Sequence, residues 1–483
     1  MRKGWRLLFM GLAIALGLGG TPRTSPAAVP CDAGLVSPTP VSLSGTLRHV
    51  VIDTACQYVY LSNAAANRIE VFSIVDKVLQ TPITVGSQPA GFDITPDGSR
   101  MYVANSGGNN ISVVDLAQRK ELKKIPVPAG FSNDTPLSLA ITNNGRALFT
   151  TTFAGSGFGA RMMQLDLTTE AVSQRTDFWL SGTTTEATFL SPSTDRSRIA
   201  IVAGDISSGP VFVYTSATNA FSPEKDLATF VGYVATNWTG SIILVDRGTY
   251  VLDAARNLLG TIPVGGLGVA LSPSGTLGYR VVDAGIDILN LDTLLKTGSV
   301  SLGDTVAGAF SLLDRGIGGM AISADGRLLA VITDHGFSLV AGAAGTNSKV
   351  FLTASVNRPA FAAGHTLTTS AITYDPGLPG SADLFLGVLL PDGVTIVFWT
   401  GGGGSAVGSL SDLRTFRPYA ANVSLATSFV TAMPNFLSYQ RTGAEPPGPY
   451  IFFNLATKAG ALADGVATND EILGLATVFF SFL

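Results

Sequence analysis

The stretch DITPDGSRMYVANSGGNNISVVDLAQRKELKKIP, residues Asp93–Pro126, contains four short apolar segments separated by turn residues. A Pro-Asp-Gly turn separates the first segment from MYVAN, and a loop rich in Gly and Asn separates MYVAN from ISVVDL. Val, Ile and Tyr favour strands, whereas Pro, Asp, Asn and Gly favour tight connections. The stretch therefore predicts a four-stranded unit built from strands alone.

The turn between the first and second strands of this unit recurs along the chain. Its seven copies begin, in steps of 36 to 51 residues, at Asp53, Thr95, Thr142, Ser191, Thr236, Ser272 and Ser323. A four-stranded propeller blade needs roughly 40–50 residues. The spacing predicts an all-β fold that begins with a seven-bladed β-propeller. Because the copies at Ser191 and Thr236 are degenerate, six or eight blades remain alternatives within the usual range of about 4–8.

The unit at Pro96–Leu116 resembles the YVTN family of β-propeller repeats, whose name-giving tetrapeptide corresponds to Tyr102–Asn105 here. By extension, the resemblance implies a propeller of WD40-like repeats over residues 41–345. The family includes surface-layer proteins and lactonase-like propellers. A shared fold does not carry a shared activity, so the resemblance implies an architecture and leaves the function open.

The N-terminus has the form of a secretory signal peptide. Arg2 and Lys3 precede the apolar run Leu7–Leu18, and small residues end the segment at Ala27. We expect a signal peptide over residues 1–27 and an N-terminal arm over residues 28–40, with an uncleaved anchor as the alternative. The mature chain is then exported to the periplasm, the cell surface or the medium, and it has no transmembrane helix.

The blade pattern stops near Gly342–Lys349, whose sequence GAAGTNSK predicts a linker. Residues 350–483 keep alternating strand-like segments and have the length of one β-sandwich, so we expect a β-sandwich accessory domain there. This region also resembles the C-terminal sandwich modules of secreted bacterial repeat proteins. The final apolar run, Ile472–Leu483, is too short for a transmembrane helix and is predicted to be the last strand.

Two cysteines, Cys31 and Cys56, lie near the expected mature N-terminus. In an oxidising compartment they are a disulfide candidate that would tie the N-terminal arm to the first blade. The alternative, one buried and one exposed free thiol, has equal weight on the sequence alone.

Charge and motifs exclude several classes of function. The net charge is −4 and charged residues make up 13% of the chain, which excludes a basic nucleic-acid surface. The three histidines, His49, His335 and His365, show no metal-ligand spacing, and we interpret His49 and His335 as unrelated surface residues. No nucleophile motif, phosphate loop or dinucleotide fingerprint is present. We therefore predict no cofactor and favour a protein without catalytic activity.

One set of acidic residues follows the repeat. Four consecutive blades have an aspartate at or just after the end of the second strand, at Asp205, Asp246, Asp283 and Asp334. The loops that follow second strands share one propeller face, and carboxylates there would suit a basic ligand or a hard cation such as calcium. Asp is also a common turn former, so the alternative is four ordinary hairpin turns.

These observations predict a secreted or cell-envelope binding scaffold whose partner is a protein or a cell-surface ligand. Two other readings remain. A lactonase-like hydrolase would act at the propeller mouth, but the sequence specifies neither a base nor a metal cluster for it. A structural cell-surface protein would also suit the low charge.

Overall fold

The computed structural model describes residues 30–483 except 129–133, 153–159, 180–182, 186, 205, 246–248, 264–265, 284, 307–317, 344–348 and 402. The expected signal peptide and part of the expected linker therefore lie outside the described residues. The described chain divides into two compact units. One comprises residues 30–142 and 146–346, and the other comprises residues 143–145 and 347–483.

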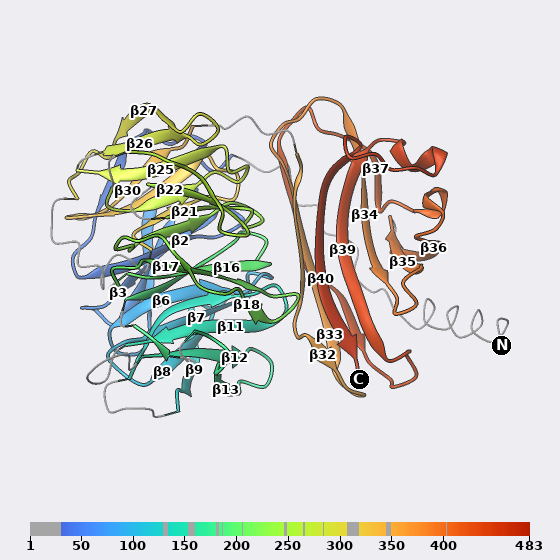
Figure 1. The fold of residues 1–483 in the computed structure, drawn as a ribbon, viewed down its shortest axis with the longest axis horizontal. Helices are drawn as coiled ribbons and strands as arrows, with labels where there is room; N and C mark the ends of the chain where they lie inside the picture. The colour runs from blue at the N-terminus through green and yellow to red at the C-terminus, as the bar shows by residue number, and fades with distance from the viewer. Residues whose placement is uncertain are drawn as a thin grey trace. The chain divides into compact units, whose positions relative to one another are not determined.

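The first unit contains, in its described part, seven small antiparallel sheets, which run from blue to yellow in Figure 1. Each blade is given from its innermost strand outward: blade 1 has β2 (Leu47–Ile52), β3 (Tyr58–Asn63), β4 (Arg68–Ser73) and β5 (Val78–Thr84), and blade 2 has β6 (Pro89–Ile94), β7 (Arg100–Asn105), β8 (Asn110–Asp115) and β9 (Lys120–Pro126). Blade 3 has β10 (Pro136–Ile141), β11 (Arg146–Thr151), β12 (Ala160–Asp166) and β13 (Val172–Gln174), with β14 (Thr183–Thr184) beside β12, and blade 4 has β15 (Thr188–Pro192), β16 (Arg198–Ala203), β17 (Pro210–Thr215) and β18 (Ala220–Phe221), with β19 (Lys225–Asp226) beside β17. Blade 5 has β20 (Val234–Thr236), β21 (Ile242–Val245), β22 (Tyr250–Asp253) and β23 (Leu258–Thr261), blade 6 has β24 (Val269–Leu271), β25 (Leu277–Val282), β26 (Gly285–Asn290) and β27 (Leu295–Ser301), and blade 7 has β28 (Met320–Ile322), β29 (Leu328–Thr333), β30 (Gly336–Ala341) and β1 (Thr39–Ser42). The prediction of an all-β fold with seven blades is confirmed.

The ring is closed by a strand from the N-terminal end of the chain. β1 pairs antiparallel with β30, so that Thr39 lies opposite Leu339 and Ser42 opposite Gly336. The closing strand ends at Ser42 and does not continue into the next apolar segment. Residues 47–52 are instead engaged as the inner strand of blade 1, where they pair with β3. Blade 7 thus combines three strands from the end of the propeller with one from its start.

The recurring turn between first and second strands contains a position with left-handed backbone. Its φ angle is 69° at Gly98, and glycine occupies the same place in four other blades, at Gly145, Gly240, Gly275 and Gly326. Glycine adopts this conformation without a steric penalty. The exceptions are Cys56 in blade 1 and Arg196 in blade 4, with φ of 54° and 62°. A side chain kept at such a position is a signal of function.

Neighbouring blades share their cores. Tyr60 and Val71 of blade 1 pack in one buried cluster with Phe92 and Met101 of blade 2. A single four-stranded sheet cannot bury both of its faces, so each blade becomes stable by packing between two others. This packing is what holds the inner strands at fixed distances around the axis.

The second unit, orange to red in Figure 1, contains two sheets in its described part. The three-stranded sheet consists of β31 (Phe351–Val356), β33 (Thr366–Asp375) and β38 (Phe429–Gln440). The seven-stranded sheet has the order β32 (Ala360–Phe361), β40 (Ile472–Phe482), β39 (Gly448–Lys458), β34 (Ser381–Leu389), β35 (Thr395–Thr400) and β36 (Gly404–Ser409), with β37 (Ala420–Ser424) beside β34. Two short 3-10 helices, η2 (Leu413–Thr415) and η3 (Ala461–Asp464), complete the unit.

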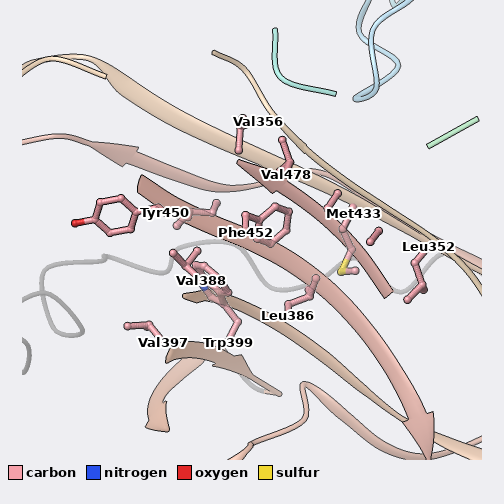
Figure 2. Close-up of a cluster of buried hydrophobic side chains, with 14 of the residues drawn as sticks. Leu352, Val356, Leu386, Val388, Val397, Trp399, Met433, Tyr450, Phe452 and Val478 are labelled. Carbon is pink, nitrogen blue, oxygen red and sulfur yellow. The ribbon is translucent and has the colours of Figure 1, made fainter. Parts of the chain in front are cut away.

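The two sheets face each other across one hydrophobic core, as in a β-sandwich. Figure 2 shows Leu352 and Met433 from the smaller sheet beside Leu386, Phe452 and Val478 from the larger one. Phe452 is fully buried. The final apolar run of the sequence is β40, whose alternate residues point into this core. The expected last strand is therefore present.

Candidate functional site

The inner strands of the propeller surround a cavity of about 200 Å³. It is lined by first strands of every blade and by the turns that follow several of them, including Thr54, Thr194 and Ala324. Every blade contributes lining residues because its first strand is the innermost one and lies beside the propeller axis. The cavity thus lies along the propeller axis and extends to the face that carries the turns between first and second strands.

An ion pair crosses one side of this channel. Arg196, from the turn of blade 4, donates through Nη1 to Oδ2 of Asp93 on the inner strand of blade 2, and the same nitrogen lies 3.3 Å from the carbonyl oxygen of Ile141 in blade 3. Both partners are nearly buried, with side-chain exposures of 14% for Arg196 and 5% for Asp93. The pair links three blades at the channel wall.

The carboxylate of Asp93 is fully engaged. Its Oδ1 accepts a hydrogen bond from the backbone N–H of Ile94 at 2.8 Å, and its Oδ2 accepts one from the backbone N–H of Ile141 at 2.8 Å as well as the guanidinium of Arg196. Asp93 therefore orients Arg196 at the channel wall.

His49 is the second polar group of the channel. Its Nδ1 accepts a hydrogen bond from the backbone N–H of Phe92 at 3.1 Å, and its ring lies 4.9 Å from the ring of Phe92. Burial lowers the pKa of His49 to about 4, although the charge of Asp93 acts in the opposite direction. The imidazole is therefore neutral near pH 7. Because Nδ1 accepts, the single proton resides on Nε2, which is a donor.

The position of His49 corrects the interpretation of it as a surface residue. It belongs to β2, lines the cavity and hydrogen-bonds across to the next blade. Gly318 fixes its ring from the other side, since a Cβ added at Gly318 would lie 2.4 Å from Cδ2 and 2.6 Å from Nε2 of His49. Any larger residue at Gly318 would displace the imidazole.

The far side of the channel is mostly apolar, although the hydroxyl of Thr236 also lines it. Blades 5, 6 and 7 contribute Ala235, Ala270 and Ala321 at the position that Asp93 occupies in blade 2. The alanines leave space opposite the ion pair, which is why a cavity exists along an axis that larger side chains would fill. The channel therefore has one wall with charged groups and one wall that is mostly apolar.

The two propeller histidines are expected to titrate on opposite sides of pH 6.5, the ordinary histidine pKa. Burial lowers the pKa of His49 to about 4, whereas Asp304, whose Oδ1 lies 2.8 Å from Nδ1 of His335, raises the pKa of the exposed His335. Nitrogen-15 NMR of the imidazoles, assigned with His335→Gln, measures both values. Between pH 6.5 and pH 4, the unfolded chain binds a proton at His49 that the folded chain does not bind. The free energy of unfolding therefore falls as the pH falls through this range. A normal His49 titration would contradict its burial.

The acidic residues predicted from the sequence lie elsewhere. Asp283 and Asp334 follow the second strands of blades 6 and 7, at the opposite end of the sheets from the cavity turns. Asp283 is exposed, and Oδ2 of Asp334 accepts from the hydroxyl of Thr305 at 2.7 Å. Asp205 and Asp246 lie outside the described residues, so a four-carboxylate site for calcium stays a prediction.

Among the described residues, one group of three or more possible metal-ligand side chains is close enough to hold an ion: Cys31, Cys56 and Asp325. In the structure the two sulfurs of this group are joined, because Cys31 and Cys56 form a disulfide with Cα atoms 5.3 Å apart. Oδ2 of Asp325 accepts from the backbone N–H of Cys31 at 2.9 Å. The disulfide therefore connects the N-terminal arm to the turn of blade 1, while the hydrogen bond connects it to the turn of blade 7.

Sequence reasoning did not find His49, Asp93 or Arg196 as site residues. One signal was available. All seven turns begin with Thr, Ser or Asp, and five of them carry glycine at the left-handed position. Arg196 replaces that glycine with a long charged side chain. No comparable signal exists for His49 and Asp93. Their place in the cavity depends on which residues of different inner strands lie near one another after the ring closes.

None of the described residues belongs to a helix with the length and hydropathy needed to cross a bilayer.

One comparison with known proteins supports the propeller. A family model described as "Lactonase, 7-bladed beta-propeller" matches residues 35–129, which include the closing strand, His49, Asp93 and blades 1 and 2. No curated protein matches the chain. A solved structure of hydrazine synthase from Kuenenia stuttgartiensis is similar with a TM-score of 0.49 and 15% identity, over 65% of this chain and 100% of that one.

Proposed function

We propose that this protein is an exported binding scaffold whose propeller takes a small ligand into its central channel. The observation that carries the proposal is the polar wall of the channel: a neutral imidazole that donates and a guanidinium oriented by a carboxylate. Binding sites are typically concave and mostly apolar, with a few placed polar groups. The disulfide and the form of the N-terminal sequence support export, since disulfides persist in oxidising compartments.

A hydrolase is the second candidate, and the family match over residues 35–129 favours it. Hydrolysis needs a group that accepts a proton. In the channel, the acceptor nitrogen of His49 is taken by the N–H of Phe92 and both oxygens of Asp93 are engaged. Because the acceptor atoms of both groups already make hydrogen bonds, binding fits the geometry better than turnover.

The proposal is tested by filling the channel. Ala270 is 4% exposed and lines the cavity, so Ala270→Phe places an aromatic ring in the free volume. We expect fragments that bind the purified chain in saturation-transfer NMR to lose their signal in Ala270→Phe. Leu79→Phe, on the outer strand of blade 1 where Leu79 is 44% exposed, is the control and is expected to keep every hit.

The same proteins distinguish the two candidates. Fragments that bind Ala270→Phe as well as the natural chain would place binding outside the channel and contradict the proposal. Turnover of a chromogenic ester or a lactone that is lost in both Ala270→Phe and His49→Leu would establish the hydrolase instead. Circular dichroism spectra of the variants check that each one folds.

A further inference from the structure

We infer that the channel selects a small, uncharged molecule that carries a carbonyl oxygen, and that His49 Nε2–H donates to that oxygen. This inference rests on the proposed function, because it names the chemistry of the ligand that the same channel would bind. It follows from three properties of the wall: what its polar groups can donate, what net charge they have, and how large the space is.

The imidazole of the polar wall offers a free donor, and the hydroxyl groups of Ser191 and Thr236 also line the cavity. Nδ1 of His49 is used by the N–H of Phe92, which leaves Nε2–H as the donor of the ring, and no hydrogen-bond partner for Nε2 is found among the described residues. The oxygens of Asp93 are used by two backbone N–H groups and by Arg196. A ligand that meets the free N–H of His49 must therefore bring an acceptor, such as a carbonyl oxygen.

The charge of the wall is balanced. The charged residues that line the cavity, within the described part of the chain, are Asp93 and Arg196, and they neutralise each other. His49 adds no charge because burial lowers its pKa to about 4. A charged ligand in this space would be desolvated without a free counter-ion, which is unfavourable. An uncharged carbonyl oxygen satisfies the donors without that penalty.

The size and the opposite wall limit the body of the ligand. The cavity of about 200 Å³ is somewhat larger than an engineered apolar cavity of about 150 Å³ that holds benzene. The side of the cavity away from Asp93 includes Ala235 and Ala270, whose side chains have no polar atoms, beside the hydroxyl of Thr236. A single six-membered ring with one carbonyl group therefore matches both walls.

Three ring compounds of matched size test the inference on the full chain: cyclohexanone, methylenecyclohexane and cyclohexanecarboxylate. One net hydrogen bond contributes about 0.5–1.5 kcal/mol, so cyclohexanone is expected to bind roughly two- to tenfold more tightly than the isosteric hydrocarbon. Dissociation constants from ligand-observed NMR measure the ratio. The preference is expected to disappear in His49→Leu and to persist in His335→Leu, a matched change at a histidine whose side chain is 76% exposed.

A conservative variant separates hydrogen bonding from folding. His49→Gln offers an amide oxygen to the N–H of Phe92 and an amide N–H to the channel, and it is expected to keep part of the preference. Equal binding of the ketone and the hydrocarbon, with both excluded by Ala270→Phe, would overturn this inference and leave the channel as a binding site. Tighter binding of cyclohexanecarboxylate than of cyclohexanone would contradict the inference that the ligand is uncharged.

Failure of the ketone to bind at all, while other fragments are still excluded by Ala270→Phe, would also overturn the inference alone. The proposed function fails only if no fragment depends on the channel. The two claims are therefore decided by different comparisons.

Discussion

Replacing Asp93 by alanine is expected to lower the free energy of unfolding of the propeller by about 3–5 kcal/mol, because one member of a buried ion pair is removed and the other is left uncompensated. Arg196 would lose its carboxylate partner at a site where its side chain is 14% exposed. The backbone N–H of Ile141 would lose its contact with Oδ2 as well. Urea denaturation of the full chain, followed by circular dichroism, measures the loss.

A double variant tests the cause of this effect. Asp93→Asn combined with Arg196→Met removes both charges and keeps an amide oxygen near the N–H of Ile141. Apolar replacement of both members of a buried pair is often close to neutral. The double variant is therefore expected to be more stable than Asp93→Ala. A loss below about 1 kcal/mol in Asp93→Ala would show that water solvates Arg196 and that the channel wall is open.

Loss of the disulfide is expected to destabilise the propeller by about 3–4 kcal/mol. Cys31 and Cys56 are separated by 25 residues, and the loop-entropy model gives a contribution of that size for such a loop. The double variant Cys31→Ser with Cys56→Ser, compared with the natural chain in urea, measures the difference. The disulfide also holds the arm that precedes the closing strand β1, so its loss is expected to release β1 from β30.

Two controls accompany this prediction. A thiol assay of the denatured natural protein is expected to find no free thiol, and two reactive thiols in material from an oxidising compartment would contradict the bond. Asp325→Asn removes the charge at the other contact of Cys31 but keeps an acceptor oxygen for its N–H. Its loss of stability is expected to be smaller than that of the cysteine variant.

The blade pattern could be predicted because it is local. Each turn between first and second strands needs a left-handed residue and side chains that accept its N–H groups, and the oxygens of Asp97 show this use, accepting from the N–H and hydroxyl of Ser99. Such requirements are met within a few residues of sequence. Counting the turns therefore gave the correct number of blades.

The candidate site could not be predicted in the same way. His49, Asp93 and Arg196 lie in blades 1, 2 and 4, and the hydrogen bond between Asp93 and Arg196 spans 103 residues. The aspartates singled out from the sequence were chosen because they repeat, yet those that the structure describes do not line the cavity. Repetition marks what each blade needs to fold, whereas the channel groups occur once.

The sequence by itself determined the all-β class, the seven blades and the positions of their turns, because strand alternation and turn chemistry are set by neighbouring residues. The sequence also distinguishes Cys56 and Arg196, which occupy the turn position where the other five blades have glycine. Only the tertiary structure decided that β1 closes the ring, that Cys31 bonds to Cys56, and that His49, Asp93 and Arg196 line one wall of the channel. These contacts depend on closure of the ring, which brings distant segments together and removes water from the groups between them.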